Sequence, residues 1–202
     1  MRVLVTGGAG FIGSHLVKHL LKETDWQIVV LDKLTYAARG GVRLEVPEVK
    51  SNPRLEVLTW DLATPLSVGF KKQLGDLNLI FHLCAESHVD ASIVDPVYFI
   101  HNNVMSTTYL LELARELPNL KKFLMFSTDE VYGHAPEGVA YKEWDRQKPG
   151  NPYSASKSAS EMICIAYQNT YRLPIVISRS MNVLGCYQES EKALGLFTQK
   201  IL

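Results

Sequence analysis

The segment TGGAGFIGS, residues 6–14, decides the fold of this chain. It joins a short apolar run to a pattern of apolar residues at helical spacing over residues 11–21. Its glycines Gly7, Gly10 and Gly13 follow a G-x-x-G-x-x-G spacing. Between a strand and a helix, such glycines allow a tight turn and a close approach of the backbone to phosphate, and the helix N-terminus attracts the anion. The segment therefore predicts a dinucleotide site.

A carboxylate stands where the adenosine ribose of a dinucleotide is usually bound. Asp32 ends a second apolar run 19 positions after Gly13, close to the roughly 20-residue offset of a ribose-binding acid. It favours NAD over NADP because a carboxylate repels a 2′-phosphate, although the adjacent Lys33 weakens that exclusion. Asp61, after a third apolar run, is a candidate contact of the adenine. For either acid, the alternative is a side chain that only caps a turn.

Short apolar runs alternate with helical patterns along the whole chain. Strand and helix in repetition predict an α/β fold, a doubly wound, Rossmann-like parallel sheet with helices on both faces, in one domain over residues 1–202. The polar stretches Thr35–Arg54 and Gly133–Pro152 are expected to be long loops. The expected strands are residues 2–6, 27–31, 55–58, 78–83, 122–126 and 175–178.

The composition excludes several classes of partner. The 202 residues include 21 basic and 21 acidic side chains, and a net charge of zero argues against nucleic acid or an anionic membrane. No window is apolar for the roughly 18 residues that a membrane span requires. The three cysteines, Cys84, Cys164 and Cys186, show no metal-ligand spacing, so no metal and a reducing compartment are expected. We therefore expect a soluble, cytoplasmic protein.

Hydroxyl and carboxyl groups gather in the segment STDEVYG, residues 127–133, directly after the fifth apolar run. Ligands of open parallel sheets bind at that edge of the sheet, although adjacent acids more often lie in a solvated turn. Further along, Tyr153 and Lys157 are one helical turn apart on the same face. An ammonium lowers the pKa of a nearby tyrosine, so this pair predicts a base that removes a proton from a substrate alcohol. Beside a nicotinamide, such a base predicts alcohol oxidation.

These segments together resemble the NAD-dependent epimerase/dehydratase family of extended short-chain dehydrogenases/reductases. Within it the chain is most similar to the nucleotide-sugar 4,6-dehydratases, because the Thr-Asp-Glu triplet and LDKLTYA favour a dehydratase over an epimerase. The matching segments are TGGAGFIGS from Thr6, LDKLTYA from Leu31, HLCAESHVD from His82, STDEVYG from Ser127, NPYSASK from Asn151 and the stretch from Ile177 to Lys192.

The resemblance implies oxidation of a nucleotide sugar at C4, loss of water across C5 and C6, and return of the hydride to C6. Tyr153, assisted by Lys157, is expected to deprotonate the C4 hydroxyl, which Thr128 also binds. Glu130 is expected to remove the C5 proton, and Asp129 to protonate the departing C6 hydroxyl. Such opposite duties require different environments for two neighbouring acids.

The resemblance also implies which residues hold NAD. Ser87 is expected to contact both cofactor and substrate. Asn102 stands where the family usually has a threonine near the cofactor, and Met181 where many relatives place a polar substrate contact. The other expected cofactor contacts are Gly7, Gly10, Phe11, Ile12, Gly13, Asp32, Lys33, Leu34, Thr35, Asp61, Leu62, Leu83, Cys84, Ala85, Glu86, Tyr153, Lys157 and Asn182.

Family members continue into a smaller domain that completes the sugar cleft. The part of this chain after about residue 185 is therefore expected to begin a substrate-binding part that is largely absent. Relatives form homodimers through the helix that here spans about 95–116 and the helix that begins near Tyr153. Two alternatives stay open: a UDP-sugar 4-epimerase or decarboxylase, which does not use Glu130 as base, and a non-catalytic NAD-binding module.

Overall fold

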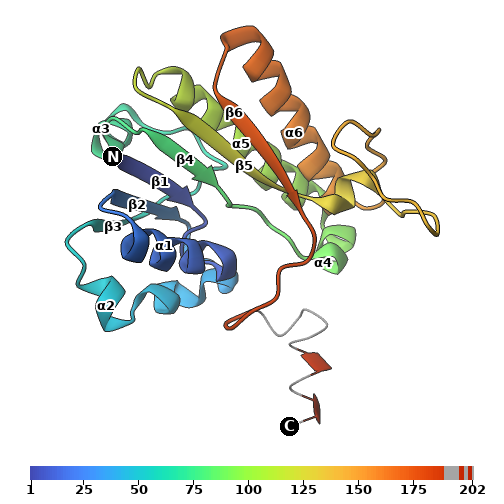
Figure 1. The fold of residues 1–202 in the computed structure, drawn as a ribbon, viewed down its shortest axis with the longest axis horizontal. Coiled ribbons are helices and arrows are strands. Elements are labelled where there is room, and N and C mark those ends of the chain that lie inside the picture. The colour runs from blue at the N-terminus through green and yellow to red at the C-terminus, as the bar shows by residue number, and fades with distance from the viewer. Residues whose placement is uncertain (189–195, 198–199, 202) are drawn as a thin grey trace.

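The computed structural model describes residues 1–188, 196–197 and 200–201 (Figure 1). Six parallel strands form one sheet in the order β3-β2-β1-β4-β5-β6. The expected Rossmann-like, doubly wound sheet is confirmed. The strands are β1 (Arg2–Thr6), β2 (Gln27–Asp32), β3 (Leu55–Thr59), β4 (Leu79–His82), β5 (Lys122–Thr128) and β6 (Ile175–Ser180).

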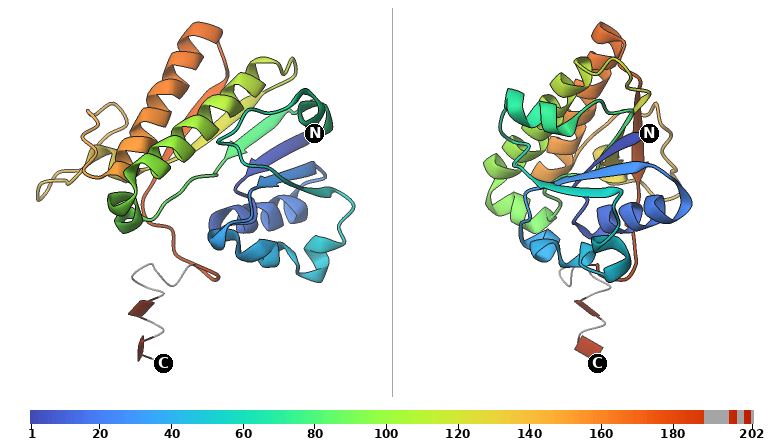
Figure 2. Two further views of the ribbon diagram at one scale, coloured as in Figure 1. Left: turned by 180° about the vertical axis from the view of Figure 1, so that it is seen from behind. Right: turned by 90° about the vertical axis from the view of Figure 1, so that its left-hand side faces the viewer.

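Helices cover both faces of the sheet (Figure 2). One face carries α1 (Phe11–Glu23), the 3-10 helix η1 (Tyr36–Leu44) and α2 (Pro47–Lys50). The other face carries α3 (Val68–Leu74), α5 (Pro96–Arg115) and α6 (Pro152–Tyr171), with α4 (Val89–Val94) beside α6. A short 3-10 helix, η2 (Asp129–Tyr132), follows β5. Among the described residues, no helix is both long and apolar enough to span a bilayer.

The two faces of the sheet build two separate hydrophobic cores. In β1, Val3 and Val5 pack with Val17 of α1, whereas Leu4 packs with Leu110 of α5 and Phe123 of β5. Successive strand side chains point to opposite faces, so a strand covered on both faces must be apolar at consecutive positions. This explains why the strands appear in the sequence as continuous apolar runs.

Several expected boundaries were wrong by a few residues. β5 extends through Thr128 because Ser127 and Thr128 continue the ladder opposite Arg179 and Ser180 of β6, so the hydroxyl pair ends the strand instead of following it. β3 ends at Thr59, which leaves Asp61 two residues beyond the strand. The expected loop 35–54 contains η1 and α2, which bury apolar side chains against α1.

The stretch 133–151 has no helix or strand, as expected. A buried ion pair fastens it to the rest of the domain. Glu161 of α6 is fully buried, lies 2.7 Å from the guanidinium of Arg179 on β6, and accepts a hydrogen bond from Gln147 in the loop. Arg179 also donates to the backbone carbonyl of Glu143 at 2.7 Å. The loop between η2 and α6 is thereby held against the end of β6.

Candidate active site

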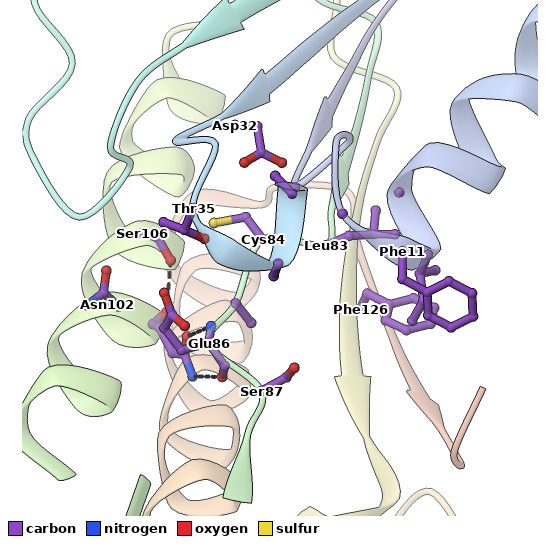
Figure 3. Close-up of a pocket in the computed structure, with 18 of the residues that line it drawn as sticks. Phe11, Asp32, Thr35, Leu83, Cys84, Glu86, Ser87, Asn102, Ser106 and Phe126 are labelled. Carbon is purple, nitrogen blue, oxygen red and sulfur yellow. Dashed lines mark hydrogen bonds between the residues drawn. The ribbon is translucent and has the colours of Figure 1, made fainter. Parts of the chain in front are cut away.

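One cavity lies at the carboxyl ends of the strands, where the strand order reverses between β1 and β4. Open parallel sheets bind their ligands at this position. In Figure 3, Asp32 lies on one side of Cys84, Glu86 and Asn102 lie on the side of α5, and Phe11 stands on the opposite wall. The cavity therefore joins the glycine turn to residues from distant parts of the sequence.

The glycine turn leaves room that a side chain would fill. Gly7 has a φ of +68°, and a Cβ there would lie 2.8 Å from the backbone nitrogen of Cys84. A Cβ on Gly13 would lie 2.1 Å from the carbonyl oxygen of Gly7. Helix α1 begins after Gly10 without a side-chain cap, whereas α5 and α6 begin at capping Asp95 and Asn151. The uncapped N–H groups of α1 fit a bound pyrophosphate.

Asp32 is fixed beside this turn. Its carboxylate accepts hydrogen bonds from the backbone N–H of Ala9 at 3.0 Å and of Leu34 at 2.9 Å. Burial raises the pKa of Asp32, and the two backbone hydrogen bonds oppose that shift. Leu34 does not line the cavity: its side chain packs on the core beneath α1, and its backbone serves to hold Asp32. The carboxylate therefore stands ready for two ribose hydroxyls.

The tyrosine and lysine of α6 face the same cavity. Lys157 is buried, and its ammonium donates a 2.8 Å hydrogen bond to the carbonyl of Phe126 on β5. Burial lowers the pKa of Lys157 to about 8. The expected lowering of the Tyr153 pKa by Lys157 is not found: burial and the nearby Glu130 carboxylate raise it to about 12. A raised pKa favours the neutral phenol, so the use of Tyr153 as a base requires further positive charge nearby.

The acid triplet follows at the end of β5. The Thr128 hydroxyl donates to the Asp129 carboxylate at 3.3 Å. Thr128 also opposes the rise in the pKa of Tyr153. It also accepts the backbone N–H of Glu130 at 3.2 Å. Thr128 and Glu130 line the cavity, whereas Asp129, half-buried at the start of η2, does not. Asn151 donates to the Glu130 carboxylate at 3.2 Å and so joins this strand end to α6.

Apart from Leu34 and Asp129, every residue predicted for the cofactor, substrate or catalysis lines this cavity. The structure thus brings the residues together, while their roles stay predictions. Among the described residues, no three His, Cys, Asp or Glu side chains gather as metal ligands. The matching stretch that ends at Lys192 lies outside the described residues from position 189 onwards.

Sequence reasoning missed two polar groups in the cavity wall. The Ser127 hydroxyl and the Trp60 indole nitrogen are buried and have no hydrogen-bond partner among the described residues. Because buried polar groups are normally satisfied, both are candidate ligand contacts. The position of Ser127 at the end of an apolar run could have predicted that its hydroxyl lines the site. Nothing in the sequence around Trp60 indicates such a position for its indole. The other lining residues without a prediction are Leu31, Tyr36, Ala37, Ala38, Ala63, Asn103, Ser106, Phe126, Ser180, Val183 and Gln188, while Met181 was noted only as a departure.

A glycine turn, a carboxylate at the end of the second strand and a Tyr-Lys pair around one cavity are typical of dinucleotide-binding α/β domains of the short-chain dehydrogenase type. The family described as GDP-mannose 4,6 dehydratase matches residues 4–202. The chain belongs to this family, and the resemblance inferred from its motifs is confirmed.

Individual relatives share this domain. The dTDP-glucose 4,6-dehydratase of Haemophilus influenzae is 40% identical over 97% of this chain and 60% of its own length. The crystal structure of DesIV, a dTDP-glucose 4,6-dehydratase from Streptomyces venezuelae with NAD bound, matches at 38% identity with a TM-score of 0.89, over 100% of this chain and 62% of that one. The chain spans about 60% of the length of the curated relatives that it matches.

The chain is also similar in sequence and structure to sugar-nucleotide epimerases. The UDP-glucuronic acid 4-epimerase of Bacillus cereus in complex with NAD is 31% identical, with a TM-score of 0.86, over 100% of this chain and 62% of that one. Both groups of solved structures contain NAD. The comparisons therefore support the family and its cofactor more strongly than any one reaction.

Proposed function

We propose that the protein is an NAD-dependent nucleotide-sugar 4,6-dehydratase that converts dTDP-glucose to dTDP-4-keto-6-deoxyglucose. The observation that carries the proposal is the position of Glu130. It lines the cavity with Tyr153 and Lys157, beyond what oxidation alone requires. A carboxylate there supplies the base that elimination requires. The similarity to dTDP-glucose 4,6-dehydratases supports the same substrate.

When bound, NAD would supply a positively charged ring that favours the Tyr153 anion and a reversible acceptor for the hydride that leaves C4 and ends on C6. Tyr153 takes the proton of the C4 hydroxyl, while Thr128, which lines the same cavity, holds the same oxygen. The C4 ketone acidifies the C5 proton, which Glu130 removes and gives back to C5 when the hydride reaches C6. Asp129, which does not line the cavity in this structure, must turn towards the sugar in its protonated form to supply the proton with which the C6 hydroxyl leaves as water. The proton that Tyr153 takes from the C4 hydroxyl balances the one that Asp129 gives up.

The test uses purified protein that includes any sequence beyond residue 202. It is incubated with NAD and dTDP-glucose, and the product is identified by mass spectrometry and NMR. The proposal expects the 4-keto-6-deoxy sugar nucleotide, with NAD regenerated. A protein that binds NAD but forms no such product contradicts it.

A second candidate is a UDP-sugar 4-epimerase or decarboxylase, which the UDP-glucuronic acid 4-epimerase structures favour. These reactions share the oxidation by Tyr153 but do not use Glu130 as base. Full turnover of a UDP-sugar by a Glu130→Gln variant identifies this alternative. A non-catalytic NAD-binding module is identified by NAD binding without a saturable response to any nucleotide sugar.

The proposal includes a homodimer in the cytoplasm. Helices α5 and α6 pack side by side, and exposed apolar side chains lie on them at Val97, Ile100 and Met162. A second copy of the same surface would cover them by pairing helices across a two-fold axis. Light scattering on the purified protein tests the pairing, and a monomer at micromolar concentration contradicts it. Cys84, Cys164 and Cys186 are free thiols, which suits a reducing compartment.

A further inference from the structure

The ammonium of Lys33 is held by three partners on the α5 side of the cavity. It donates to the Asn102 side-chain oxygen at 2.7 Å and to the Tyr98 hydroxyl at 3.2 Å. It also lies 3.1 Å from a carboxylate oxygen of Glu86. The Tyr98 hydroxyl in turn donates to Glu86 at 3.1 Å. Because an ammonium has three hydrogens, these partners satisfy it completely.

Glu86 cannot easily move away from this pair. Its side chain is 8% exposed. Its backbone N–H donates to the Asn103 side chain at 2.8 Å, and its carbonyl accepts from the same side chain at 3.0 Å. Asn103 is itself anchored on α6 through a 2.8 Å hydrogen bond to Ser156. The carboxylate that holds Lys33 is therefore part of a fixed wall.

This arrangement bears on which dinucleotide the site accepts. Asp32, immediately before Lys33, is the carboxylate placed for the ribose hydroxyls, and a 2′-phosphate there would bring nearly two further negative charges. A free ammonium beside Asp32 would compensate that charge, whereas the Lys33 ammonium is already paired. The charged side chains among the described lining residues are four carboxylates, Asp32, Asp61, Glu86 and Glu130, and two ammonium groups, Lys33 and Lys157.

We propose that Glu86 is a specificity-determining residue: by pairing with Lys33 it withholds that cation from a 2′-phosphate, and the site thereby selects NAD over NADP. The inference rests on the proposed NAD-dependent function and adds to it a residue that acts through Lys33. It also accounts for the opposing expectations from sequence, in which Asp32 disfavours NADP and the adjacent Lys33 weakens that exclusion.

The test measures dissociation constants of NAD and NADP by isothermal titration calorimetry on the complete protein. Glu86→Gln keeps the shape but removes the charge, and we expect the NADP-to-NAD ratio of dissociation constants to fall about tenfold, the gain from one hydrogen bond between charged partners. In a Glu86→Gln/Lys33→Gln double variant, the ratio returns to within about twofold of wild type, because no cation is released. Glu56→Gln, the same charge change in the remote pair with Arg2, leaves the ratio unchanged.

A milder variant covers the case in which Glu86→Gln does not fold. Tyr98→Phe, at an exposed position, removes one hydrogen bond from Lys33 and one from Glu86, so the ratio should fall in the same direction by a smaller factor. An unchanged ratio in the folded variants overturns the inference, as does an equal fall in the double variant. A wild-type protein that binds neither dinucleotide instead contradicts the proposed function.

Discussion

The side-chain amide of Asn151 donates a 3.2 Å hydrogen bond to the carboxylate of Glu130, so the N-cap residue of α6 touches an acid of η2, two residues after β5. The oxygen of the same amide accepts the backbone N–H of Ser154 at 2.8 Å and completes a capping box. The Asn151 side chain therefore both caps α6, the helix that contains Tyr153, and binds Glu130 of the acid triplet.

Substitutions at Asn151 separate its two tasks. Asn151→Ala removes the cap, and we expect the free energy of unfolding to fall by about 1 kcal/mol. Asn151→Asp keeps a good cap but sets a carboxylate against Glu130, so stability is retained while turnover falls at least about tenfold through misplacement of the acid. Urea unfolding and product assays check both, and full turnover in Asn151→Asp would show that the contact with Glu130 is incidental.

Tyr153→Phe removes a phenol hydroxyl from the wall of the cavity. We expect turnover to fall by about 10²- to 10⁴-fold, the usual contribution of a general base, because the C4 hydroxyl then has no proton acceptor. The dissociation constant of NAD should change little, since the phenyl ring remains in the cavity wall. Tyr171→Phe, at the exposed end of the same helix, is the matched control and should keep wild-type turnover. Comparable losses in both variants would argue against a specific role of Tyr153.

Alanine substitutions at two glycines test whether the glycine turn after β1 requires residues without a side chain. Gly13→Ala places a methyl group 2.1 Å from the carbonyl oxygen of Gly7, so we expect the free energy of unfolding to fall by about 1–3 kcal/mol and NAD binding to weaken. Gly69→Ala adds the same methyl to α3, where nothing lies within 4 Å, and should stabilise the helix by up to about 1 kcal/mol. Chemical unfolding and calorimetry with NAD measure both effects. Equal tolerance of alanine at the two positions contradicts the proposed close approach.

His82 predicts a pH dependence of stability. It is buried between the hydroxyls of Thr6 and Thr107 at 2.9 and 3.0 Å, and burial lowers its pKa to about 3. In the unfolded chain His82 takes up a proton near pH 6.5, whereas in the folded chain it stays neutral down to about pH 3. The free energy of unfolding therefore holds the full contribution of neutral His82 above pH 6.5, and this contribution declines as the pH falls from 6.5 towards 3. The slope is up to about 1.4 kcal/mol per pH unit.

A His82→Gln variant isolates this contribution. Urea unfolding at about pH 7 and pH 5.5 should give a smaller loss for the variant than for wild type, because the remaining histidines titrate in both proteins. Identical losses would mean that His82 is protonated in the folded protein. The comparison uses differences between the two proteins, so it does not depend on the absolute stability of either.

The parts of this structure that sequence reasoning predicted are those in which neighbouring residues act together. The glycine turn, Asp32 and the Tyr153-Lys157 pair each depend on spacing within one strand-turn-helix unit or one helical turn, so their placement followed from the sequence. The apolar runs identified the strands because both faces of the sheet are covered.

Contacts between distant segments were beyond that reasoning. The hydrogen bond from Lys157 to Phe126 spans 31 positions, and the one from Lys33 to Asn102 spans 69. In both cases the sequence predicted another role for the lysine. Lys157 is not among the groups that lower the pKa of Tyr153, and Lys33 is already paired with Glu86. Leu34, which is also predicted to contact the cofactor, does not line the cavity; its φ is +57° and its backbone N–H donates to Asp32. Such choices depend on packing, which spacing along the chain does not encode.

The most direct test of the dehydratase assignment is a single-turnover experiment on a Glu130→Gln variant of the complete protein with NAD and dTDP-glucose. Oxidation at C4 does not require Glu130, whereas removal of the C5 proton does. The account predicts that the absorbance of reduced nicotinamide appears and persists, with no 4-keto-6-deoxy product. Wild-type rates of product formation in this variant, with no build-up of reduced cofactor, would contradict it.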